Sequence, residues 1–190
     1  RGKPDRRAVR RAPAASRGLM TQAQAPILHA GLLALRAGGR WRGVLVLGTS
    51  GSGKSDLALR SLDAGFRLVA DDRTCVWTSG GHPYGRAPDP LAGLLEVRGV
   101  DVVRVPALAF CRIDLALSAA TPGYPPERLP DPGLLDVAGA AVPHLVLRLT
   151  DASAPHRVKE ALWRLGGGRE ESYQGGLPAP AAPVLGESAP

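Results

Sequence analysis

Short aliphatic runs alternate with glycine-rich and proline-rich segments along the middle of the chain. Residues 44–47 are four consecutive aliphatic side chains, a pattern typical of a strand buried on both faces. Across residues 54–64 the apolar side chains follow a rough helical stripe, and Gly65 comes next as a C-terminal cap. Residues 66–70 again have the pattern of a strand. The pattern therefore predicts a strand, loop, helix and strand in succession, which is typical of an α/β fold.

Other strands are expected on both sides of a long loop. A short apolar segment at residues 27–35 comes before the unit just described, and the predicted strands after it are 74–77, 94–97, 100–105, 110–117 and 144–149. Ser79-Gly80-Gly81 predicts a hairpin turn, and the composition predicts loops at residues 83–90 and 121–132. Ser153 is placed to cap a last helix that runs to Leu165.

The 190 residues predict one folded domain, at residues 21–165, between a basic arm at 1–20 and a flexible tail at 166–190. Of the net charge of +7, the arm contributes +6, so the rest holds 17 basic groups against 16 acids. The arm offers one way to contact a nucleic acid, but such a composition more often indicates solvated chain, and no nucleic-acid partner is expected.

Two further observations concern the compartment. No run of 18 uncharged apolar residues and no secretion signal is present, so the prediction is a cytoplasmic protein without a membrane span. Cys75 and Cys111 lie far apart in apolar surroundings and are predicted to be buried thiols. No pair of cysteines or histidines has the spacing of zinc ligands.

A complete phosphate-binding pattern, G-x-x-x-x-G-K-[ST], follows the predicted strand at 44–47 and opens the predicted helix. Its residues are Gly48, Thr49, Ser50, Gly51, Ser52, Gly53, Lys54 and Ser55. Successive backbone N–H groups and the helix dipole can then face one anion. Lys54 should reach the β- and γ-phosphates of a nucleotide, and Ser55 should bind magnesium. The alternative is a glycine-rich turn that binds nothing.

Asp71 and Asp72 end the strand that follows the predicted helix. A right-handed crossover sets this strand parallel to the first one, so both carboxylates should arrive at the sheet edge that holds the phosphate loop. Consecutive strand residues point to opposite faces. One aspartate can therefore hold magnesium while the other accepts the proton of an attacking hydroxyl. The alternative is an ordinary turn or helix-capping pair.

Together these motifs resemble the catalytic domain of HPr kinase/phosphorylase, in the short form associated with alphaproteobacteria. The resemblance spans residues 26–165 and depends on four segments: 27–31, 48–55, 68–72 and the signature-like 93–100. It implies a P-loop-containing mixed sheet with flanking helices, of the phosphoenolpyruvate carboxykinase-like, HPr kinase type. It also implies phosphorylation of a serine on an HPr-like phosphocarrier of a phosphotransferase system with ATP and Mg²⁺, reversal by phosphorolysis, and a hexamer.

The resemblance also implies roles for single residues. Lys54 would bind phosphate, Ser55 and Glu96 would coordinate magnesium, and Asp72 would be the proton acceptor. His29 would lie near the reacting phosphate. Without the resemblance, a lone histidine is more often structural, and Glu96 would be one member of an acid-base pair on an exposed strand.

Arg128 is the candidate for a further catalytic arginine of the family, in the segment Glu127-Arg128-Leu129-Pro130. Between residues 142 and 153 the chain has no clear counterpart of the family's basic Gly-Arg-Asn segment, which is linked to dephosphorylation.

Two other functions fit the phosphate loop. A small-metabolite kinase would transfer phosphate to a sugar or an acid and need no acceptor protein. A nucleotide-sensing regulator would bind ATP without transferring phosphate. The assays that separate them are labelled-ATP transfer and transfer to a purified carrier.

Overall fold

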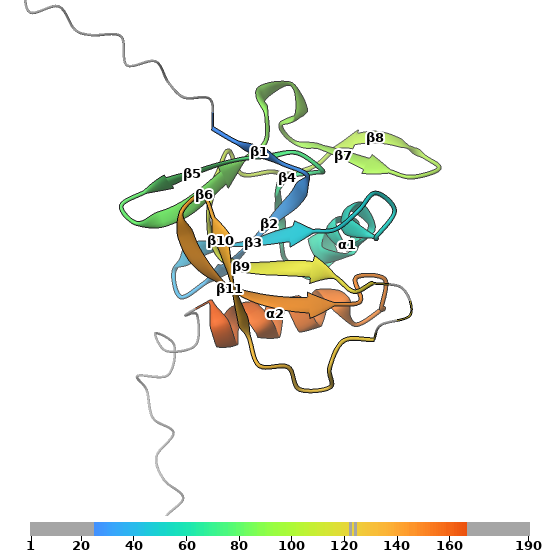
Figure 1. Cartoon of the computed structure of the whole chain (residues 1–190). Coiled ribbons are helices and arrows are strands. Elements are labelled where there is room, and N and C mark those ends of the chain that lie inside the picture. Colours follow the sequence, from blue (N-terminus) through green and yellow to red (C-terminus); the bar gives the residue numbers. More distant parts are fainter. Residues whose placement is uncertain (1–24, 122, 124, 167–190) are drawn as a thin grey trace, which may run out of the picture.

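The computed structural model describes residues 25–121, 123 and 125–166 (Figure 1). The predicted arm at residues 1–20 lies outside the described residues, as does the predicted tail beyond residue 166. The helices are α1 (Lys54–Asp63), α2 (Ala154–Leu165) and a short 3-10 helix, Asp89–Leu91. The strands are β1 (Ile27–Leu28), β2 (Ala30–Ala37), β3 (Arg40–Leu47), β4 (Arg67–Ala70), β5 (Thr74–Ser79), β6 (His82–Arg86), β7 (Leu94–Val97), β8 (Asp101–Arg104), β9 (Cys111–Ala119), β10 (Gly133–Val137) and β11 (Ala140–Leu147).

Nine of these strands form one curled mixed sheet, and β7 and β8 form a separate hairpin. In the sheet β3 pairs with β2 antiparallel and with β9 parallel, and β9 pairs with β11 parallel. β4 pairs with β2 antiparallel, so β4 runs in the direction of β3 with β2 between them. The carboxyl ends of β3, β4, β9 and β11 therefore point to the same side of the sheet (Figure 1).

Each face of the sheet has its own hydrophobic core. Both helices cover one face, where Leu57 of α1 and Val158 of α2 pack with Val44 and Val46 of β3. Leu45 faces a second cluster on the other side of the sheet. All three β3 side chains are at most 1% exposed. This confirms the prediction that the strand at 44–47 is buried on both faces, and the chain has the expected α/β mixed sheet with flanking helices.

The prediction of a loop at residues 83–90 is wrong for the first half of that range, because residues 82–86 form strand β6. β6 pairs with β5 on one side and with β9 on the other. Gly80 and Gly81 both have positive φ and form the predicted two-residue turn that joins β5 to β6. Gly85 is necessary for packing, because a Cβ there would lie 2.6 Å from a methyl carbon of Leu32. The glycine therefore belongs to a crowded strand.

A second correction concerns β10 and the start of β11. The β11 strand begins at Ala140, four residues before the predicted start, and β10 was not predicted at all. β10 has no aliphatic run of the kind that marks a core strand, and Leu134 in it is 74% exposed. Its partner is β11, through a turn in which Ala138 and Gly139 have positive φ. Pairing with a neighbour, more than burial, makes this segment a strand.

The two cysteines are free thiols and buried, as predicted. Burial, with the nearby Asp114 carboxylate as a second cause, raises the pKa of Cys111 to about 12. This thiol therefore stays protonated and unreactive at neutral pH. In the part of the chain that the structure describes, no helix has the length and apolar character needed to cross a membrane.

Candidate active site

The phosphate loop curls because two of its glycines have positive φ. Gly51 has φ 82° and Gly53 has φ 94°, which side chains with a Cβ seldom adopt. A Cβ on Gly53 would also lie 3.0 Å from Thr150 Cγ2. Gly53 is the N-cap of α1, and no side chain caps the helix there. The first amides of α1 have no intrahelical acceptor, so this turn leaves N–H groups for an anion.

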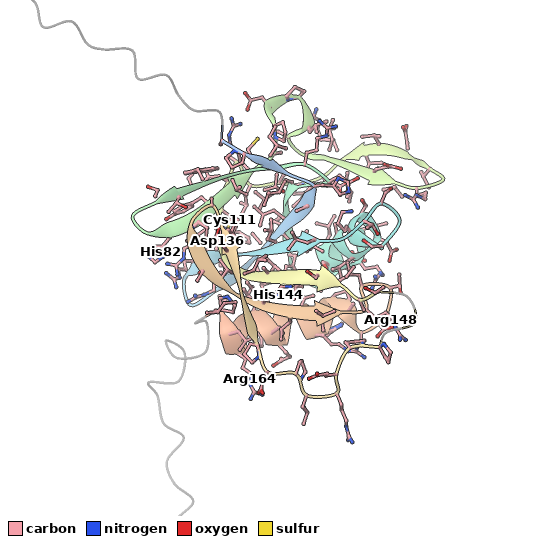
Figure 2. The ribbon with its side chains drawn as sticks, viewed as in Figure 1. His82, Cys111, Asp136, His144, Arg148 and Arg164 are labelled. Atoms are coloured by element: carbon pink, nitrogen blue, oxygen red, sulfur yellow. The ribbon has the colours of Figure 1, made fainter. Side chains whose placement is uncertain are left out.

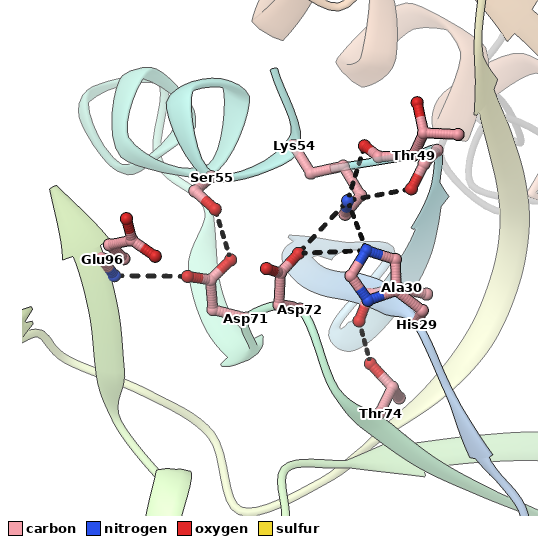
Figure 3. A network of polar contacts seen from close by, with 10 residues as sticks. His29, Ala30, Thr49, Lys54, Ser55, Asp71, Asp72, Thr74 and Glu96 are labelled. Atoms are coloured by element: carbon pink, nitrogen blue, oxygen red, sulfur yellow. Dashed lines mark hydrogen bonds and ion pairs between the residues drawn. The ribbon is translucent and has the colours of Figure 1, made fainter. Parts of the chain in front are cut away.

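Lys54 lies at the centre of a polar network (Figure 3). Its Nζ donates to the carbonyl oxygens of Gly48 at 2.9 Å and Thr49 at 3.1 Å. The same Nζ is 3.2 Å from His29 Nε2 and 3.2 Å from Asp72 Oδ1. The residue is only 5% exposed. The ammonium group is therefore held in place beside the loop, and the network brings two predicted residues, His29 and Asp72, to it.

Asp71 takes part in a separate set of contacts (Figure 3). Ser55 Oγ donates to Asp71 Oδ1 at 3.0 Å, and the Glu96 backbone N–H donates to Oδ2 at 3.2 Å. Burial raises the pKa of Asp71, the two hydrogen bonds oppose this, and the nearby Asp72 and Glu96 charges add to it. Asp71 therefore links the start of α1 to the β7–β8 hairpin that carries Glu96.

Asp72 contacts different groups from those that Asp71 contacts. Its side chain is 43% exposed and its Oδ1 lies 3.9 Å from His29 Nε2. Asp72 has φ 57°, an uncommon value for a residue with a side chain, so the chain turns sharply between the two aspartates. The two carboxylates therefore contact different groups, and the prediction that they have different tasks remains a prediction.

The aspartates reach the loop through the strand order. β3 and β4 are both antiparallel to β2, which lies between them, so they run in the same direction. The carboxyl end of β4 thus lies at the sheet edge from which the phosphate loop starts, as predicted. The sequence did not show that β2 separates the two strands.

A cavity of about 310 Å³ lies beside the loop. Ser55, Asp72, Glu96 and Arg98 are among the residues that line it. Among the described residues no three acidic, histidine or cysteine side chains gather closely enough to hold a metal by themselves. Magnesium in nucleotide sites is commonly held by one or two protein oxygens together with phosphates and water. The uncapped amides, the ammonium group and these oxygens fit a magnesium-bound nucleoside triphosphate.

The positions of two arginines relative to this cavity differ from expectation. Arg128 is exposed in the loop between β9 and β10 and is not among the residues that line this cavity, so it is the one predicted side chain that the structure does not bring to the loop. Arg98 does line the cavity, directly after β7, and was not predicted as a site residue. Its place two residues after Glu96, within the segment 93–100, was the available signal.

Comparison with known proteins gives three findings. Residues 23–110 match the model of the HPr Serine kinase C-terminal domain. The HPr kinase/phosphorylase of Brevibacillus brevis is 47% identical over 64 residues, which are 33% of this chain and 21% of that protein. The HPr kinase/phosphorylase of Clostridium tetani is 44% identical over 66 residues, 35% of this chain and 22% of that protein. The matched part is thus about a fifth of the length of these relatives.

A solved structure shows the same fold. The Hpr(Ser) kinase/phosphatase from Coxiella burnetii superposes with a TM-score of 0.66 and 21% sequence identity, over 76% of this chain and 99% of that one. With the family match and the relatives, this confirms the resemblance to the HPr kinase/phosphorylase catalytic domain that the sequence motifs indicated.

Proposed function

We propose that this chain is a protein serine kinase that transfers the terminal phosphoryl group of ATP, with Mg²⁺, to an HPr-like phosphocarrier of a phosphotransferase system. The observation that supports this most is the contact of Asp72 Oδ1 with Lys54 Nζ, at 3.2 Å. It sets a partly exposed carboxylate beside the group that should bind the β- and γ-phosphates. The similarity to HPr kinase/phosphorylase proteins suggests the acceptor.

The proposed proton acceptor is Asp72. Bound ATP would supply the phosphoryl group, and magnesium held by the oxygen ligands of the chain would neutralise part of the phosphate charge. Asp72 takes the proton of the serine hydroxyl while the serine oxygen forms the new bond to phosphorus. Lys54 and the amides at the start of α1 stabilise the negative charge of the transferred group. The bond between the γ-phosphorus and the oxygen of the β-phosphate breaks, and ADP leaves with the electron pair of that bond.

Asp71, Ser55 and Glu96 form the proposed metal side of the site. The Ser55 hydroxyl and the Asp71 carboxylate already lie 3.0 Å apart, and Glu96 lines the same cavity. Oxygen ligands of this kind are those that magnesium prefers.

His29 has a positioning role in this proposal. Its Nε2 is 3.2 Å from Lys54 Nζ and 3.9 Å from Asp72 Oδ1, so it limits where both groups can move. Phosphorolysis of the phosphoserine would pass the phosphoryl group to inorganic phosphate and give pyrophosphate, while protonated Asp72 returns its proton to the serine oxygen. These groups would belong to a kinase domain at residues 21–165, flanked by the segments at 1–20 and 166–190, in a cytoplasmic hexamer.

The test is transfer to a purified HPr-like carrier, weighed by mass spectrometry after incubation with ATP and magnesium. The wild-type chain should add one phosphoryl group to a serine. Asp72→Asn should reduce the rate by at least about 100-fold, since a positioned general base contributes that much. Calorimetry should show that this variant still binds ATP.

Asp63→Asn is the matched control, because Asp63 is exposed at the last residue of α1, the end away from the phosphate loop. It should transfer at the wild-type rate. Normal turnover by Asp72→Asn would refute the role of Asp72. Label that passes from ATP to a small metabolite without a carrier would instead favour the small-metabolite kinase, and ATP binding without any labelled product would favour the regulator.

A further inference from the structure

A second cavity, of about 750 Å³, lies on the other side of the phosphate loop from the carboxylates. Its walls are residues 48–52 of the loop and the carboxyl ends of β9 and β11, where Ser118, Thr121 and Arg148 are found. The first cavity instead extends towards Asp72 and the β7–β8 hairpin. Ser50, Gly51 and Thr150 line both cavities, so the two lie next to each other at the tip of the loop.

The charge of this second cavity is positive. Among the described residues that line it there is no aspartate or glutamate, whereas Asp56, Asp72 and Glu96 line the first cavity. Arg148 is the only charged side chain in the described lining of the second. The uncapped start of α1 adds partial positive charge nearby. An anion is therefore the ligand that this side of the loop favours.

Arg148 is available to bind such an anion. It is exposed at the carboxyl end of β11 (Figure 2), and its side chain makes no hydrogen bond or ion pair with the described residues. The arginines nearby differ: Arg60 donates to the carbonyl oxygens of Leu149 and Asp151, and Arg157 pairs with the Asp151 carboxylate at 2.9 Å. Among the described residues, Arg148 therefore has no acidic partner.

The proposed chemistry sets the direction of a nucleotide in the loop. In that reaction the transferred phosphate lies near Asp72 and Glu96, and the second cavity, which shares Ser50 and Gly51 with the first, has room for the remainder of the molecule. Its volume is within the range of ordinary small-molecule sites. We infer that the second cavity holds the nucleoside end of the nucleotide and that Arg148 binds the α-phosphate. This inference rests on the proposed function and adds to it a binding subsite and the residue that serves it.

The experiment compares two ligands, only one of which has the nucleoside and the α-phosphate. Magnesium-ATP has the α-phosphate and the nucleoside, and magnesium-pyrophosphate has neither. Isothermal titration calorimetry should show that Arg148→Met raises the Kd of ATP about 10-fold, the size expected for loss of one charge-assisted hydrogen bond. The Kd of pyrophosphate should change less than about twofold. Arg148→Lys keeps the charge and should recover most of the ATP affinity.

The matched control is Arg164→Met. Arg164 is an exposed arginine in the last turn of α2 and lines neither cavity (Figure 2). This variant should bind both ligands like the wild type. An unchanged ATP affinity in Arg148→Met overturns the inference, and so does an equal loss for ATP and pyrophosphate, which would place Arg148 at the β- and γ-phosphates.

The outcome also separates the inference from the proposed function. If the wild type binds ATP in the predicted Arg148-dependent way but transfers nothing to the carrier, the kinase proposal fails and the subsite stands. If transfer occurs and Arg148→Met binds ATP normally, the kinase proposal stands and the subsite fails. A wild type that binds neither ligand refutes both.

Discussion

Two clusters of charged side chains lie at opposite ends of β3, and they differ in access to solvent. At the carboxyl end, Lys54 lies 3.2 Å from Asp72, which is 43% exposed beside a cavity. Near the amino end, Arg42 and Asp114 are 0% and 2% exposed, at 4.0 Å from each other. Both clusters pair an acid with a base. The acid is partly exposed to solvent in the first cluster and almost fully buried in the second.

The inner cluster joins separate parts of the fold. Arg42 donates to the carbonyl oxygen of Gly166 at the end of α2, and Arg112 Nε lies 2.9 Å from Asp114 Oδ1. Burial raises the pKa of Asp114, and the charges of Arg112 and Arg42 oppose this. The contacts tie β3 and β9 to the last helix. An acid and a base therefore also meet in the core of the fold, so their presence does not by itself indicate a reaction site.

The largest expected effect is loss of transfer without loss of stability. Lys54→Met should lower the rate of phosphoryl transfer by about 10³-fold, because it removes a preorganised positive charge from the transferred group. Its melting temperature should stay close to that of the wild type. Rates from the carrier assay and a thermal melt followed by circular dichroism measure the two quantities. A Lys54→Met chain that transfers normally would refute the assignment of the phosphate loop.

The opposite result is expected at the inner cluster. Arg42→Met should lower the free energy of unfolding by about 3 kcal/mol, because it leaves a buried carboxylate with less compensating charge. The transfer rate per folded molecule should stay within about twofold of the wild type, as expected for a change remote from the site. Urea denaturation gives the first quantity. If Arg42→Met keeps its stability but loses transfer, the two clusters do not have the separate roles assigned here.

A smaller effect is expected in the pH dependence of stability when Asp71 is replaced. The folded-state pKa of Asp71 is raised, so the folded chain holds this proton more tightly than the unfolded chain does. The wild type therefore loses stability relative to Asp71→Asn as pH rises from below the ordinary pKa of 3.8 through the raised value. Urea denaturation at several pH values should show that the free energy of unfolding of Asp71→Asn rises relative to that of the wild type as the pH increases towards neutral. A constant difference across this range would contradict the raised pKa.

The candidate site was predictable to the extent that it is local. The phosphate loop is eight consecutive residues between a strand and a helix, and Asp71 and Asp72 follow one helix and one strand later. Such short separations leave few ways to place the groups. Arg98 and Arg148 could not be placed in this way, because the hairpin and the strand that carry them are brought to the loop by packing with distant segments.

The sequence by itself determined the strand, phosphate loop and helix, the hairpin turn at Gly80 and Gly81, and the arrival of two aspartates at the same sheet edge. Hydrophobic periodicity and glycine positions determine the conformation of neighbouring residues, so these features can be predicted from the sequence. Only the tertiary structure decided that β2 separates β3 from β4, that residues 82–86 form a strand, and which charged groups are buried. These depend on which segments pair across long stretches of chain, and pairing sets both burial and access to solvent.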